Sequence, residues 1–129
     1  MMTRTELQKV IEAVDANFPE WVSVYLTGNS DRILVEGIYS ARGEDENHDR
    51  AVVKETIAQA KRILGDALQE RFPERTFLHA ARHSCRFWFV GMHNMGVFHR
   101  LGIVCGIRIK LSEEERSLIR LGAAKKLFA

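Results

Sequence analysis

Residues 76–111 have the sequence TFLHAARHSCRFWFVGMHNMGVFHRLGIVCGIRIKL, and this stretch decides the fold. It is rich in β-branched and aromatic residues, which favour strands over helices. We expect three strands in it, over residues 77–83, 85–92 and 97–109. Asn94-Met95-Gly96 predicts a three-residue hairpin loop between the last two strands, with its glycine in the left-handed conformation.

The predicted loop fixes how the last two strands pair. It places Cys85 directly opposite Cys105 and Phe87 directly opposite Ile103. One face of the hairpin is then almost wholly apolar, as expected where one face of a sheet is buried. We expect both cysteines to be small core residues that remain thiols, because two cysteines in a domain of this size do not make a disulfide scaffold.

The segments before this stretch show two different periodicities. Apolar residues recur at helical spacing over residues 5–18 and 49–71, whereas residues 21–27 and 32–40 alternate or are rich in β-branched residues, as strands are. The turn cluster Gly28-Asn29-Ser30-Asp31 joins the two strands into a hairpin. The first half of the chain therefore predicts helix, strand, strand, helix.

A last helix is predicted over residues 113–127. Ser112 and Glu115 form a capping box at its start. Lys125 and Lys126 favour the negative end of its dipole. The whole chain, residues 1–129, is then a single α+β domain, an antiparallel five-stranded sheet with three helices in the order helix-strand-strand-helix-strand-strand-strand-helix.

Glycines inside predicted elements indicate points of close backbone approach. Gly65 lies within the long second helix, where we expect it to allow close packing against the sheet. Gly102 and Gly106 lie within the last strand. They predict either a bulge or a place where a helix packs closely on the sheet.

The composition limits the classes of function. The chain is 46% apolar and 28% charged, as is usual for a globular protein, and its net charge is only +2. Basic and acidic residues are mixed, whereas a nucleic-acid binder shows a clustered basic face. No apolar run is long enough to span a bilayer, and the N-terminus lacks the apolar segment of a signal peptide. We expect a cytoplasmic protein.

A cluster of histidine and cysteine is the place where chemistry is most expected. His79, His83 and Cys85 are of ligand types that zinc prefers, and in a strand they would point to one face. Close Cys-x-x-Cys spacing is absent from the sequence, so structural thiols and partly exposed histidines are the alternative. We expect no metal, no cofactor and no catalytic residue.

The second face of the predicted hairpin has the composition of a protein interface. Trp88, Phe98 and Met92 are flanked by Arg86 and Arg100. Aromatic residues, methionine and arginine are enriched in the cores of such interfaces. These five residues are our candidates for partner binding; the alternative is that a helix of the same chain covers them.

The order of elements resembles that of the Roadblock/dynein-light-chain family, whose domain runs helix, two strands, helix, three strands, helix. The turn Thr27-Gly28-Asn29-Ser30-Asp31 resembles the glycine-containing turn that members often carry between their first two strands. The resemblance implies a non-enzymatic protein that dimerises by joining sheets edge to edge beside the second helix and binds small GTPases or motor complexes. The matching stretches are residues 5–18, 21–40, 49–71, 76–109 and 113–127.

Two other classes stay open. The chain is similar in element order to bacterial type III secretion chaperones, small α/β dimers that bind unfolded effector segments, although its pI of about 8.7 departs from their acidic character. A metal-binding enzyme or ligand sensor that uses the His/Cys stretch is the third class. We expect a non-enzymatic interaction or regulatory module, a homodimer whose partner is a small GTPase or a secreted substrate.

Substitutions in the two candidate clusters should separate these classes. Replacing Trp88 or Phe98 with alanine should weaken partner binding by roughly 2 kcal/mol, because aromatic anchors dominate interfaces. Replacing His79 with glutamine or Cys85 with serine should leave the affinity unchanged, as measured by titration calorimetry. Loss of one equivalent of bound zinc in the latter variants would contradict the interaction class.

Overall fold

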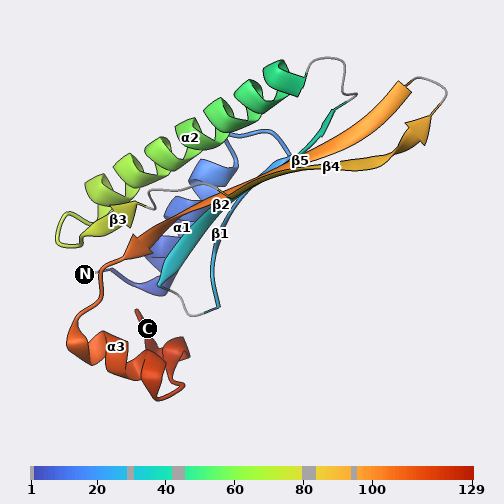
Figure 1. Ribbon diagram of the computed structural model, residues 1–129. Helices are drawn as coiled ribbons and strands as arrows, with labels where there is room; N and C mark the ends of the chain where they lie inside the picture. Colours follow the sequence, from blue (N-terminus) through green and yellow to red (C-terminus); the bar gives the residue numbers. More distant parts are fainter. Residues whose placement is uncertain (1, 29–30, 42–45, 80–83, 94–95) are drawn as a thin grey trace.

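The chain folds into helices packed on an antiparallel sheet (Figure 1). The computed structural model describes residues 2–28, 31–41, 46–79, 84–93 and 96–129; for residues 41, 46, 84–93 and 96–99 it describes the backbone alone. The elements are α1 (Arg4–Asp15), β1 (Val22–Leu26), β2 (Arg32–Ala41), α2 (Glu46–Arg71), β3 (Phe77–His79), β4 (Ser84–His93), β5 (Gly96–Ile109), α3 (Glu113–Arg120) and the 3-10 turn η1 (Ala124–Lys126).

The α+β class, three α-helices and antiparallel sheet predicted from the sequence are confirmed, but the sheet is four strands wide. The strands lie in the order β1-β2-β5, and both β3 and β4 pair with the remaining edge of β5. β3 pairs with residues 107–109 and β4 with residues 96–104. The two short strands therefore share one position, so the five strands of the sheet occupy four positions across it.

The hairpin register differs from the prediction by two residues. Cys85 pairs with Ile103, not with Cys105, which instead lies opposite Val35 of β2. His93 pairs with Gly96, so Gly96 belongs to β5 and the predicted three-residue loop is one residue too long. A bulge between Phe89 and Gly91 adds the second residue of the shift.

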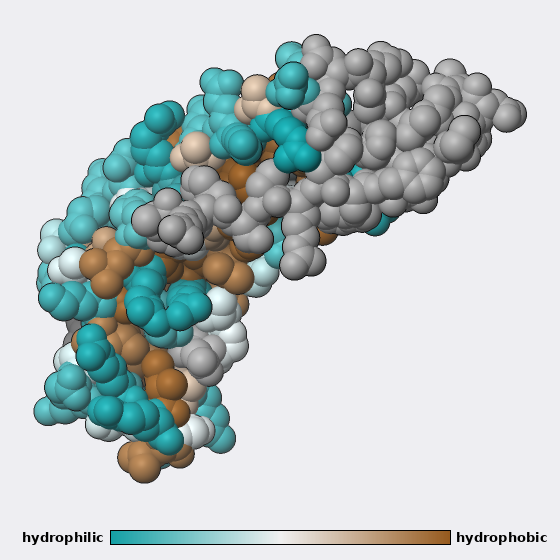
Figure 2. Space-filling model, viewed as in Figure 1, coloured by the Kyte–Doolittle hydropathy of each residue, from teal (hydrophilic) through white to brown (hydrophobic). Residues whose placement is uncertain are grey.

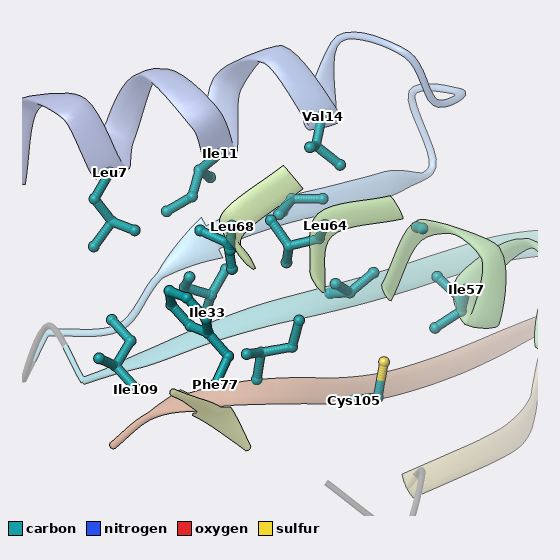
Figure 3. Close-up of a cluster of buried hydrophobic side chains, with 14 of the residues drawn as sticks. Leu7, Ile11, Val14, Ile33, Ile57, Leu64, Leu68, Phe77, Cys105 and Ile109 are labelled. Atoms are coloured by element: carbon teal, nitrogen blue, oxygen red, sulfur yellow. The ribbon is translucent and has the colours of Figure 1, made fainter. Parts of the chain in front are cut away.

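One hydrophobic core lies between the sheet and the helices α1 and α2. Figure 3 shows Leu7, Ile11 and Val14 pointing from α1 toward Leu64 and Leu68 of α2. The inward positions of the strands alternate with outward ones, as the pleat requires. Those of β1, β2 and β5 are Val22, Val24, Ile33, Val35, Leu101, Ile103, Cys105, Ile107 and Ile109.

The last helix is shorter than predicted. α3 begins at the expected capping box, in which the Ser112 hydroxyl and the Glu115 carboxylate each accept a backbone N–H from the other residue. It ends at Arg120 because Gly122 adopts a positive φ of 74°, a conformation that closes helices. Lys125 and Lys126 therefore lie in η1, and the expected run to residue 127 is wrong.

Two glycines allow α2 to approach the sheet closely. A Cβ atom on Gly65 would lie 2.6 Å from Cε1 of His79, so the close packing predicted for this glycine is confirmed. A Cβ atom on Gly37 of β2 would lie 2.8 Å from Cδ1 of Ile57 and 2.9 Å from Cζ3 of Trp21.

The β2–β5 pairing runs without a shift past Gly102 and Gly106, so the bulge expected there is wrong. The nearest atom to a Cβ on Gly106 belongs to Leu34 of the neighbouring strand rather than to a helix.

Replacing Gly37 with alanine should lower the free energy of unfolding by about 1–3 kcal/mol, the usual cost of overpacking a core. Ile57 is fully buried and the Trp21 ring packs against the core, so neither has room to move. Gly28→Ala is the matched control, because nothing lies within 4 Å of its Cβ position. Urea denaturation measures both; equal stability of the two variants would contradict the close approach.

Candidate functional site

The face of the sheet opposite α1 and α2 is the main surface on which a site can form. In the described part of the chain no helix packs over it, and its side chains alternate with the buried row. Ile38 and Leu78 are large apolar residues with 45% and 46% of their surface exposed. We define the open face by the outward residues of the strands, Ser23, Tyr25, Arg32, Leu34, Glu36, Ile38, Leu78, Arg100, Gly102, Val104, Gly106 and Arg108.

The middle of the open face combines apolar residues with the carboxylate of Glu36, and its ends are cationic. Leu34 lies opposite Gly106 and Ile38 opposite Gly102, so a large side chain on β2 faces a residue without a side chain on β5. Near the centre, Glu36 accepts a hydrogen bond from the Tyr25 hydroxyl at 3.0 Å. Desolvation is the largest cause that raises the pKa of Tyr25, and the hydrogen bond to Glu36 and the negative charge of Glu36 raise it further. The Tyr25 hydroxyl therefore stays a neutral donor.

The predicted partner-binding residues belong to the β4–β5 hairpin. Arg86 pairs with Gly102 and Trp88 with Arg100, beside the open face, and the Arg100 side chain is exposed. Gly91 pairs with Phe98 and Met92 with Val97. Only the backbone pairing is described for Arg86, Trp88, Met92 and Phe98, so their role as contacts stays a prediction.

The His/Cys cluster is described only in part. His79 ends β3 and is exposed, with its ring beside Gly65 of α2. His83 lies outside the described residues, and Cys85 is described by its backbone alone. Among the described residues, no three His, Cys, Asp or Glu side chains come together as metal ligands. The candidate set His79, His83 and Cys85 therefore stays untested.

Cys105 is a buried core thiol, as predicted. Burial raises the pKa of the Cys105 thiol, and the positive charge of Lys61 opposes this shift. The thiolate, which is the nucleophilic form, is correspondingly disfavoured. Cys105 therefore acts as a small apolar side chain of the core.

An ion pair holds α3 at one end of the sheet, apart from α1 and α2 (Figure 1). Arg75, which follows α2, donates two hydrogen bonds to the Glu115 carboxylate, at 2.8 and 2.6 Å. Both side chains are only about one-fifth exposed. The guanidinium also lies 4.9 Å from the centroid of the Phe128 ring, which is buried, and the carbonyl of Phe128 accepts the N–H of Arg4. The end of the chain is thus fastened to both α1 and α3.

A pocket of about 420 Å³ lies between α3 and the end of the sheet. Arg108 and Leu78 come from the open face, and Ile119 and two arginines come from α3. Four cationic side chains and one carboxylate line it. The lining residues are Asp31, Leu78, Arg108, Ile109, Lys110, Leu111, Arg116, Ile119 and Arg120.

Sequence analysis did not single out the pocket or the residues of β1 and β2 on the open face. The alternation of residues 32–40 was a usable signal, because it assigns Leu34, Glu36 and Ile38 to one row. The pocket had no such signal. Its residues come from four separate segments: strand pairing brings three of them together, and the docking of α3 adds the fourth.

No protein-family model matches the chain, and neither a curated protein nor a solved structure matches it significantly. Within the described residues, none of the helices combines the length and the apolar character needed to cross a membrane. The structure thus defines a class by fold alone: an α+β domain in which two helices cover one face of an antiparallel sheet.

The stability of the protein should depend on the ionisation of Glu115. The hydrogen bonds from Arg75 lower the pKa of Glu115 to about 2 from its ordinary value of 4.5. Because the folded-state pKa is the lower one, the contribution is complete above about pH 5 and is lost as the pH falls toward 2. Glu115→Gln should lower the free energy of unfolding at neutral pH by about 1–3 kcal/mol and flatten its decline between pH 5 and pH 2.

Glu114→Gln is the matched control, since Glu114 is exposed in the same turn of α3. Urea denaturation followed at several pH values measures both variants. A Glu115→Gln protein with the pH dependence of the unmodified chain would contradict the role of this ion pair.

Proposed function

We propose that this chain is a non-enzymatic protein-interaction module that works as a homodimer joined through the open face. The observation that supports the proposal is the unequal covering of the sheet. Two helices cover one face, whereas Tyr25, Ile38 and Leu78 are exposed on the other. Exposed apolar side chains gathered on one face and rimmed by charges mark interaction surfaces.

A second copy of the chain is the occupant that this surface favours. An isologous interface must be complementary to itself, so it must contain both members of each contact. The open face carries Glu36 near its centre and arginines at both ends, Arg100 and Arg108, each four residues from Val104 along β5. Two copies related by a two-fold axis can place the carboxylate of one against an arginine of the other. The glycine positions on β5 allow the sheets to approach to the usual spacing of about 10 Å.

Face-to-face association is favoured over joining at the edge strand β1. Asp15 at the end of α1 accepts the backbone N–H of Val24 in β1, at 2.9 Å. Part of the hydrogen-bonding capacity at the edge of β1 is therefore already used within the chain, so this edge is less available for pairing with another strand. The Roadblock-like element order implies edge-to-edge dimers, so the two modes make different predictions.

We propose that the β4–β5 hairpin is where the dimer binds its partner. The last β2–β5 pair is Ala41 with His99, so the hairpin continues beyond it as a two-stranded ribbon that contains Phe98 and Met92. Trp88, Arg86 and Arg100 lie where this ribbon joins the sheet. A small GTPase is the partner that the Roadblock resemblance implies, and a secreted substrate is the one that the chaperone resemblance implies; both are consistent with a cytoplasmic protein.

Replacing Ile38 with glutamate should convert the dimer to a monomer, because it would bury a charge in the middle of the interface. Ile63→Glu is the matched control, since Ile63 is exposed on α2, away from the open face. Sedimentation velocity and light scattering at micromolar concentrations give the mass, and circular dichroism verifies the fold of each variant.

Two outcomes would contradict the proposal. A monomeric unmodified chain across the micromolar range would remove the homodimer. An Ile38→Glu protein that stays dimeric would exclude the open face and leave the edge-to-edge mode.

A further inference from the structure

We propose that the pocket between α3 and the sheet binds an acidic segment of a partner protein, in which carboxylates flank a large apolar side chain. The inference deepens the proposed function and rests on its claim that the chain is an interaction module. It concerns the end of the sheet. Arg108 lies about 13 Å along β5 from Val104, at the centre of the open face, because a strand rises about 3.3 Å per residue. Arg108 and Leu78 belong to both the pocket and the open face, whereas Lys110, Arg116 and Arg120 line the pocket alone and test it separately.

The charge of the pocket is the first reason. Arg108, Lys110, Arg116 and Arg120 line it, with Asp31 as the lone carboxylate among the described lining residues. Arg108 also pairs directly across the sheet with Arg32, and both side chains are exposed. Like charges in directly opposed positions of a sheet repel each other. A bound carboxylate would relieve this repulsion, so the arrangement favours an anionic occupant.

The existing ion pairs of α3 do not fill this role. Glu113 contacts Arg116 at 3.5 Å and Arg120 at 3.4 Å, but all three side chains are more than half exposed. Such surface pairs contribute little, because solvent screens them. An incoming carboxylate held against the pocket can therefore exchange with Glu113 at little cost.

The apolar part of the pocket favours a polypeptide over a simple anion. Leu78 is 46% exposed at its wall, and Leu111 and Ile119 are half-buried beside it. Figure 2 shows a hydrophobic band that runs over α3 and onto the adjacent end of the sheet between hydrophilic side chains. Leu121, just after α3, is 81% exposed. An inorganic anion would leave this surface exposed, whereas a segment with apolar and acidic residues would match both parts.

The test uses a fluorescein-labelled peptide of alternating glutamate and leucine residues, with the full-length protein and fluorescence anisotropy as readout. We expect saturable binding, and binding roughly tenfold weaker for Arg108→Gln, as expected from the loss of one charge-assisted hydrogen bond. Arg120→Gln, on the other wall, should also weaken binding. Arg62→Gln is the matched control: it removes an exposed arginine of α2, outside both the pocket and the open face, and should change nothing.

Each other outcome would overturn the inference. Absence of binding would remove the site, and equal binding to Arg108→Gln and Arg62→Gln would show general attraction to a cationic surface. Equal binding of a peptide with glutamine in place of glutamate would show that charge is not recognised. Binding of dodecanoate that depends on Arg108, without binding of the peptide, would assign the pocket to a small amphiphile.

The Ile38→Glu variant separates this inference from the proposed dimer. Because Arg108 and Leu78 belong to the open face as well as to the pocket, the peptide should bind this variant at least as tightly as it binds the unmodified chain. If the unmodified chain proves monomeric, or Ile38→Glu stays dimeric, peptide binding that still depends on Arg108 would leave the pocket standing. A dimeric chain that does not bind the peptide would contradict the pocket and leave the proposed dimer standing.

Discussion

Burial of one row of β5 beneath α2 is the constraint on which the rest of the structure depends. Leu101, Ile103, Cys105, Ile107 and Ile109 alternate along the central strand, and each is at most 4% exposed. At roughly 25 cal/mol for each Å² of apolar surface removed from water, this row is a main source of folding free energy. A strand shifted by one residue would place glycines and arginines in the core instead, so the register of β2 on β5 follows from this burial.

The same alternation produces the open face. Every residue that β5 buries is flanked by one that points away from the helices, and in the described residues α1 and α2 cover the buried face alone. The third helix lies at the end of the sheet because Arg75 binds Glu115 and Phe128 packs beneath the same guanidinium. The basic pocket is a consequence of that docking, to which Leu118 and Ile119 of α3 also contribute by packing against the core.

The sequence predicted the elements better than it predicted how they meet. The cap at Ser112 and the helical spacing around Leu64 and Leu68 depend on neighbours within a few residues, so a local pattern reveals them. The hairpin register failed because two single-residue shifts, a shorter loop and a bulge after Phe89, preserve the alternation of apolar residues while moving each partner. Apolar residues on both strands make several such registers acceptable to the sequence pattern.

What the sequence by itself determined is the class of the fold, the order of its elements, the close approach at Gly65 and the burial of Cys105. These follow from periodicity, caps and residue size, which act locally. The tertiary structure alone decided that β3 and β4 share one edge of β5, that the face with Ile38 is left uncovered, and that Arg108 and Arg120 line one pocket. The physical reason is that these relations join residues far apart in the chain, and their free energy arises only when the whole core is assembled.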